Sequence, residues 1–148
     1  MEKHSFIFSP GNWLGEGTIR LSMIEEDLVF FTRWKILEKD SSGCMECIQE
    51  IQVKGLSDIM INHFFLSEFS PLSFLILMEN HAVGKVEGTG IINPSMVGWE
   101  FRAPEIGFEG FEFYERKTDE LYHVHGEFST NEDLRTTIHG KIWRQVVS

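Results

Sequence analysis

Apolar and polar residues alternate along most of this chain, in short stretches separated by polar turns. A period of two is typical of strands with one buried face, and helical periodicity is nearly absent. Only 55–60 and the first ten residues leave room for a single helical turn. The alternation predicts ten strands, at 12–22, 28–38, 44–54, 59–67, 72–79, 82–92, 96–102, 107–116, 120–129 and 134–146.

The connections between these strands are too short for helical crossovers, and most hold a few polar residues that suit hairpins. Hairpin-connected strands form an antiparallel meander, which either exposes two edges or closes on itself. Because closure removes the edges, we expect an all-β fold: a single closed, up-and-down antiparallel barrel of about ten strands that forms one domain over residues 1–148.

Sequence motifs near the two ends of the chain resemble those of a known protein family. GNWLGEG at 11–17 is followed by alternating residues, and TTIHGKIWRQ at 136–145 falls in the last strand. This resembles the calycin superfamily of lipocalins and fatty-acid-binding proteins, and the first motif is most similar to the nitrobindin branch, which consists of heme proteins. The resemblance implies that Arg144 packs across Trp13, within about 6 Å of its ring, and closes the barrel floor. His139 is the residue closest to the heme-ligating position of that branch, although its surroundings differ.

Two glycines in the first motif, Gly15 and Gly17, share a strand face with Trp13. Their missing side chains let the strand coil sharply and leave space around the indole. The motif is therefore expected at the point where the chain enters the barrel.

Alternation also predicts which side chains face the interior. Uncharged polar groups in a dry core cost about 1–3 kcal/mol each when unpaired, which favours a cavity that orients a small hydrophobic or amphipathic ligand. The alternative is that the aromatic rings fill the barrel, and a central void of at least ~300 Å³ would distinguish the two. The expected ligand-binding residues are Trp34, Gln49, Asn62, Phe64, Trp99, Phe111, Phe113 and Tyr122, with Thr32 facing the same space.

A row of ionisable residues, His123, His125 and Glu127, follows one face of the strand at 120–129. If residue 125 pairs with residue 139, His139 completes a three-histidine cluster of the kind that zinc accepts. The alternation turns this row outward, so we expect neither a metal site nor a catalytic site there. A single β-bulge would reverse the face and make the row an interior acid–base group.

The amino-acid composition excludes some classes of binding partner. Thirteen Lys and Arg against 23 Asp and Glu give a formal net charge of −10, which repels nucleic-acid phosphates and anionic membranes. No apolar run approaches the ~18 residues of a membrane span, and the N-terminus lacks the apolar region of about 7–15 residues of a signal peptide. Cys44 and Cys47 fall on opposite strand faces, which disfavours a disulfide or a chelate. These features predict a cytoplasmic protein without membrane insertion.

The function expected from these patterns is non-enzymatic binding of a small apolar or amphipathic molecule inside the barrel, with no cofactor. Two alternatives remain open at this point. One is a heme-binding protein or barrel enzyme that uses His123, His125, Glu127 or His139. The other is a filled barrel that serves as a protein interaction module.

Overall fold

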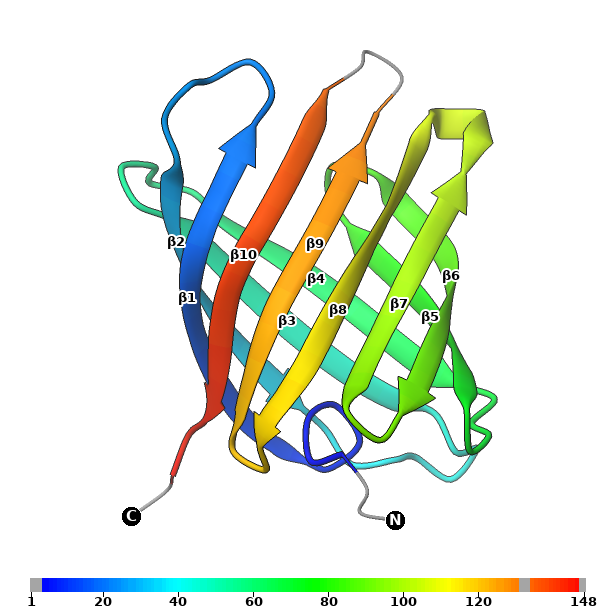
Figure 1. The fold of residues 1–148 in the computed structure, drawn as a ribbon. Coiled ribbons are helices and arrows are strands. Elements are labelled where there is room, and N and C mark those ends of the chain that lie inside the picture. Colours follow the sequence, from blue (N-terminus) through cyan, green and yellow to red (C-terminus); the bar gives the residue numbers. More distant parts are fainter. Residues whose placement is uncertain (1–3, 131–133, 147–148) are drawn as a thin grey trace.

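In a computed structural model, ten antiparallel strands close into a barrel (Figure 1). The structure describes residues 4–130 and 134–146. Each strand pairs with its neighbours in sequence, and β1 also pairs with β10, so the sheet has no free edge. The strands are β1 (Gly11–Leu21), β2 (Leu28–Ile36), β3 (Met45–Val53), β4 (Ile59–Ser67), β5 (Ser73–Asn80), β6 (Gly84–Asn93), β7 (Met96–Ala103), β8 (Phe108–Thr118), β9 (Leu121–Ser129) and β10 (Arg135–Arg144).

All ten predicted strands are present, and their ends differ from the predicted ones by no more than two residues. The predicted closed all-β barrel is therefore confirmed. The one helical turn of the described residues is the 3-10 helix η1 (Pro104–Ile106), which lies outside both segments where the sequence left room for one. No helix in the described ranges is long and apolar enough to cross a membrane.

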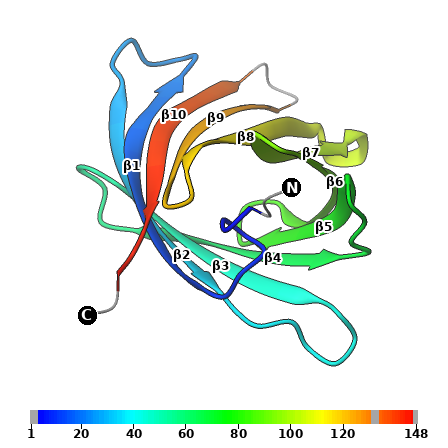
Figure 2. The ribbon, with the colours of Figure 1, turned by 60° about the horizontal axis from the view of Figure 1, so that its bottom comes forward.

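The N-terminal segment closes one end of the barrel. Residues 4–10 turn across the lower opening, at the end where both termini lie, and sit within the ring of strands (Figure 2). Phe6 and Ile7 have no exposed surface. Phe6 lies at the centre of an aromatic cluster, because its ring centroid is 4.6–5.6 Å from those of Trp13, Trp34, Tyr114 and Tyr122.

The pair expected to close the floor is only partly formed. Trp13 is buried and faces Arg144 in the register between β1 and β10. However, Arg144 is exposed, its guanidinium lies beside Gly11, and neither cation–π contact of the described residues involves it. The rings of Phe6 and Tyr122 cover the Trp13 indole instead, so the predicted cation–π closure is wrong.

The glycines of the first motif allow two backbones to approach closely. A Cβ added at Gly17 would lie 2.1 Å from the carbonyl oxygen of His139 and 2.6 Å from the Cα of Gly140. One at Gly15 would lie 2.7 Å from the carbonyl oxygen of Lys141. The absence of side chains at Gly15 and Gly17 therefore allows β1 and β10 to pack closely, and its purpose is not to leave space around Trp13.

Strand β8 presents the face opposite to the one expected. Glu112 and Tyr114 are buried in the barrel interior, with 8% and 1% of their surface exposed. Phe111 and Phe113 are half-buried and stack on each other on the outer wall, with centroids 4.9 Å apart. The prediction that these two phenylalanines face a ligand in the barrel is thus wrong.

A β-bulge explains this reversal. Thr118 pairs with Leu121 next to the hairpin, but Arg116 rather than Lys117 pairs with Tyr122. Lys117 is therefore the extra residue of β8. Without it, Phe113 and Phe111 would share the inner face with Tyr122, because a shift of one residue turns every side chain to the other side of the sheet.

Candidate ligand-binding site

The barrel interior has a packed lower half. Trp34, Phe64 and Trp99 are fully buried there, with ring centroids 5.2–6.1 Å apart. Tyr122 packs below them against Phe6. These four predicted ligand-binding aromatics lie inside the barrel, but they form its floor and do not line its cavity.

A cavity of about 220 Å³ occupies the upper half. It is smaller than the void of at least ~300 Å³ expected from the sequence, so the prediction of a pocket of that size is wrong, and the cavity has room only for a smaller molecule. Met60, which is 51% exposed, lies on its rim, so the cavity reaches the surface at the end away from the termini. Its apolar lining includes Ile19, Phe30, Ile51, Met78, Val124 and Ile138.

One wall of this cavity carries a chain of hydrogen bonds across four strands, which we call the polar ladder. Asn80 Nδ2 donates to Asn62 Oδ1 at 3.0 Å, and Asn62 Nδ2 donates to Gln49 Oε1 at 3.1 Å. Gln49 Nε2 donates to Thr32 Oγ1 at 3.2 Å. Two of its members, Gln49 and Asn62, are predicted ligand-binding residues, and all four line the cavity.

The backbone fixes the direction of the polar ladder at both ends. Thr32 Oγ1 donates to the carbonyl oxygen of Glu50 at 2.9 Å, and a carbonyl can only accept. Asn80 Oδ1 accepts hydrogen bonds from the backbone N–H groups of Ala82 and Val83. Each amide oxygen of the ladder is therefore used as an acceptor, while each amide nitrogen keeps a second hydrogen.

Glu112 and Tyr114 on β8 also line the cavity. The hydroxyl of Tyr114 donates to Glu112 Oε1 at 2.8 Å. Burial raises the pKa of Glu112 to about 7, against the opposing effects of the Tyr114 hydroxyl and the Trp99 indole N–H. The Trp99 N–H stabilises the ionised form of Glu112, although the position of this N–H does not meet the criteria for a hydrogen bond. Burial likewise raises the pKa of Tyr114, so its hydroxyl keeps its proton at neutral pH.

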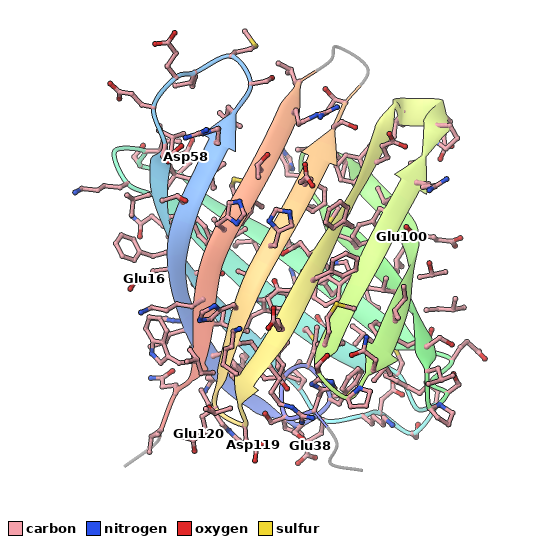
Figure 3. All side chains as sticks on the ribbon, viewed as in Figure 1. Glu16, Glu38, Asp58, Glu100, Asp119 and Glu120 are labelled. Atoms are coloured by element: carbon pink, nitrogen blue, oxygen red, sulfur yellow. The ribbon has the colours of Figure 1, made fainter. Side chains whose placement is uncertain are left out.

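Glu112 differs from the other acidic groups of the molecule in its surroundings. The labelled carboxylates of Figure 3 lie on the outer wall or at the rims of the barrel, where water solvates them: Glu16, Glu38, Asp58, Glu100, Asp119 and Glu120. The negative charge of the chain is thus mostly external, and Glu112 is the acid that borders the interior cavity.

The histidine row lies on the outer wall, as the alternation of β9 predicts. His125 pairs with His139 in register, and their Nδ1 atoms are 3.2 Å apart. Glu127 Oε2 lies 3.4 Å from His125 Nε2. His123, His125 and His139 border an open surface depression with Phe113 rather than the interior cavity. In the described ranges, no group of three or more His, Cys, Asp and Glu side chains is arranged to hold a metal ion.

The two cysteines are both free. Cys47 is buried, and this burial raises the pKa of its thiol to about 12, so it stays protonated at neutral pH. A thiolate is the reactive form of cysteine. Cys47 is therefore an inert core residue in this structure.

Comparisons with known proteins identify the fold. No protein-family model matches the sequence, and no curated protein matches it. The S-type phycobiliprotein lyase CPES from Guillardia theta aligns over 95% of this chain and 90% of its own, with a TM-score of 0.71 and 10% identity. The two chains share the fold of a closed antiparallel β-barrel. EF1p2_mFAP2b, solved bound to DFHBI, aligns over 97% of this chain and 100% of its own, with a TM-score of 0.56 and 10% identity. Likeness at this identity shows the fold alone, and the finer resemblance to the nitrobindin branch stays a prediction.

Sequence reasoning missed three features of the site. Phe6 lies in a segment without periodicity, where the sequence offers only the short apolar run Phe6–Phe8. Asn80 falls in the short polar segment between the strands predicted at 72–79 and 82–92, so the sequence predicts a loop there. The inward face predicted for Phe111 and Phe113 turns Glu112 outward, although Tyr114 directly after Phe113 indicates that aromatic residues occupy both faces of this strand.

Proposed function

We propose that this calycin-like barrel binds a small amphipathic molecule in the upper half of its interior. The proposal rests on one observation, the polar side chains that line part of an otherwise apolar cavity. Four linked side chains occupy one wall, and Glu112 with Tyr114 lies on β8. A barrel that served only as a filled scaffold would be more stable with apolar side chains here, because burying polar groups costs free energy.

The cavity volume limits the size of the ligand. About 220 Å³ corresponds to roughly seven water molecules at ~30 Å³ each. Long-chain fatty acids, retinoids, bilins and heme are larger than this, and the packed aromatic floor leaves no further depth. The ligand therefore belongs to the small end of the range. Of the two proteins that share the fold, one is named a phycobiliprotein lyase and one is solved with DFHBI bound, which supports small-molecule binding as a use of such barrels.

A heme or an acid–base site that depends on the histidine row receives less support. His123, His125 and His139 all lie on the outer wall. No histidine of the described chain lines the cavity. A heme held inside the barrel would thus lack a histidine ligand.

A matched pair of variants tests the proposal. Ile51→Phe adds volume to the lining of the cavity, and Ile48→Phe adds the same volume on the outer wall of the same strand. The probes are small aromatic cations, anions and neutral molecules, together with fatty acids, retinoids, bilins and heme. Binding to the folded state at a hundred times the dissociation constant stabilises it by about 2.7 kcal/mol, which a thermal shift detects.

We expect at least one small probe to stabilise the wild type and Ile48→Phe but not Ile51→Phe. Native mass spectrometry of protein purified from its own host should show a retained small molecule with the same dependence. If no probe or host molecule binds, or if Ile51→Phe binds as well as the wild type, the filled-barrel interaction module becomes the better account.

A further inference from the structure

We infer that the ligand is a small amine or a comparable N–H donor, whose N–H group contacts Glu112 and whose opposite end presents a hydrogen-bond acceptor to the polar ladder. The inference rests on the proposed function, because it concerns the same cavity. It follows from the different hydrogen-bonding capacities of the two polar regions of the lining.

The β8 side of the cavity offers an acceptor. A carboxylate accepts several hydrogen bonds, and the Tyr114 hydroxyl supplies one to Glu112 Oε1. The register partners of Glu112 on the two adjacent strands are Trp99 and Gly126, neither of which carries a charge. A buried carboxylate is costly without a cationic partner or further donors. The Trp99 indole N–H also favours the carboxylate, but the described lining supplies no cationic partner for it. A charged N–H group on the ligand would supply that partner.

No cation of the described lining compensates Glu112 from another strand. Of the cavity residues, Lys141 is the one basic residue, and its ammonium lies 3.9 Å from Glu16 Oε1. Glu16 points away from the barrel on the outer wall (Figure 3). The other polar residues of the cavity lining are uncharged: Thr32, Gln49, Asn62, Asn80 and Thr136. Besides Glu112 and Lys141, the titratable side chain of the described lining is Tyr114.

The polar ladder offers donors. Its amide oxygens accept hydrogen bonds from within the ladder or from the backbone, and the backbone contacts at its two ends set this direction. The hydrogens left over belong to the amide nitrogens, since each donates one of its two within the ladder. Gln49 and Asn62 are therefore suited to a carbonyl, ether or phenol oxygen of the ligand, and not to a second N–H group.

The titration of Glu112 determines the pH dependence of binding. With a pKa of about 7, the carboxyl of the empty barrel is mostly protonated at pH 6 and mostly ionised at pH 8. An amine binds the ionised form, so its affinity should rise about tenfold between these pH values. A ligand that brings its own carboxylate would bind the protonated form, and its affinity should fall over the same range.

Two probes with the same phenol ring separate these cases: tyramine, which ends in an ammonium group, and 4-hydroxyphenylacetate, which ends in a carboxylate. Calorimetric titrations at pH 6 and pH 8 compare the wild type with Glu112→Gln. Glu100→Gln is the matched control, since Glu100 lies on the outer wall of β7 (Figure 3). We expect tyramine to bind more tightly at pH 8. Glu112→Gln should weaken it about tenfold or more and abolish the pH dependence, because a hydrogen bond to a charged group is lost. Glu100→Gln should change neither.

The inference is overturned if tyramine fails to bind, if its affinity does not rise with pH, or if 4-hydroxyphenylacetate binds more tightly than tyramine to the wild type. The wild-type pH profile needs no variant, so the test holds even if Glu112→Gln fails to fold. These outcomes leave the proposed function intact, because that proposal fails only if Ile51→Phe has no effect on binding or nothing binds at all.

Discussion

The Tyr114 hydroxyl donates a hydrogen bond to Glu112 Oε1 at 2.8 Å, and both side chains are buried on the inner face of β8. This contact brings an acid and a phenol together in a largely apolar interior. Because burial affects the carboxylate more strongly than the Tyr114 hydrogen bond does, the pKa of Glu112 rises to about 7. The protonation of one side chain therefore influences both the charge within the cavity and the stability of the barrel.

We expect Glu112→Gln to stabilise the empty barrel at pH 8. The pKa of a free Glu is 4.5, so between pH 4.5 and pH 7 the folded state holds a proton that the unfolded state has lost. The stabilisation linked to Glu112 is complete below pH 4.5 and is lost as the pH rises through 7. At pH 8 the variant should be more stable by on the order of 3 kcal/mol, and at pH 4, below both pKa values, it should nearly equal the wild type.

Urea denaturation at several pH values measures this difference, with Glu100→Gln as the control for removing a surface carboxylate. An equal dependence of stability on pH in wild type and Glu112→Gln would show that the carboxyl is solvated.

The N-terminal segment should contribute strongly to stability. Phe6→Ala removes a fully buried ring that contacts four aromatic neighbours, so we expect a loss of roughly 3–5 kcal/mol in the free energy of unfolding. Trp13→Ala should cost a similar amount. The two rings meet edge to face at 5.4 Å, so the double variant should lose less than the sum, by about 0.5–1.5 kcal/mol.

Leu72→Ala, at an exposed position, is the control and should change stability by less than about 0.5 kcal/mol. A comparably small effect of Phe6→Ala in denaturant melts would mean that the segment is not part of the folded core.

His4 should make the barrel sensitive to acid. Its Nε2–H donates to the Asn93 carbonyl at 2.6 Å, because a carbonyl can only accept. In the neutral imidazole, Nδ1 then accepts from the Tyr122 hydroxyl, which lies 2.7 Å away. Burial lowers the pKa of His4 below 6.5. As the pH falls below 6.5, the unfolded state takes up a proton before the folded state does, so stability decreases.

The variant His4→Gln should lack this loss of stability between pH 6.5 and pH 5, whereas His81→Gln, in an exposed turn, should retain it. Denaturant melts across this range provide the measurement. Parallel curves for wild type and His4→Gln would indicate that the imidazole protonates freely in the folded protein.

Alternation was sufficient to predict the strands and the closed barrel because a period of two depends on nothing beyond the strand itself. The inner face of β8 depends instead on the bulge at Lys117 in the hairpin to β9. A bulge changes the count of residues between two strands without changing their composition, so alternation alone cannot detect it. The residues that line the cavity show the same difference between regular strands and the bulged strand. Gln49 and Asn62 lie on regularly alternating strands and line the cavity as expected, whereas Glu112 lies beyond the bulge.

The floor of the barrel depends on contacts between distant parts of the chain. Phe6 meets Tyr114 and Tyr122, which lie more than a hundred residues further along the sequence. No local pattern specifies such contacts. The family resemblance supplied a residue for this position, Arg144, but the ring of Phe6 occupies the place over Trp13.

Close packing along the β1–β10 seam should make Gly17→Ala strongly destabilising. The added methyl group would lie 2.1 Å from the His139 carbonyl oxygen, and backbone on both strands must move to accept it. We expect a loss of at least about 1–3 kcal/mol, the usual cost of overpacking. Thr18→Ala, on the outer face of the same strand, is the control. A melting temperature equal to that of the wild type would show that the two strands lie further apart.

The three histidines on the outer wall, His123, His125 and His139, should have no part in ligand binding within the cavity. His125 and His139 face each other across β9 and β10, with Nδ1 atoms 3.2 Å apart, and the sheet separates them from the interior. The triple variant with His123, His125 and His139 replaced by Gln should therefore bind cavity ligands with unchanged affinity. The same variant should lose any weak affinity of the wild type for zinc or nickel, because imidazole nitrogens are the ligands that these metals prefer on such a surface. Parallel titrations of the two proteins with tyramine and with zinc measure both effects. Loss of ligand binding in the triple variant, with its fold intact by circular dichroism, would mean that β9 presents its other face to the cavity and would revive the acid–base alternative for this row.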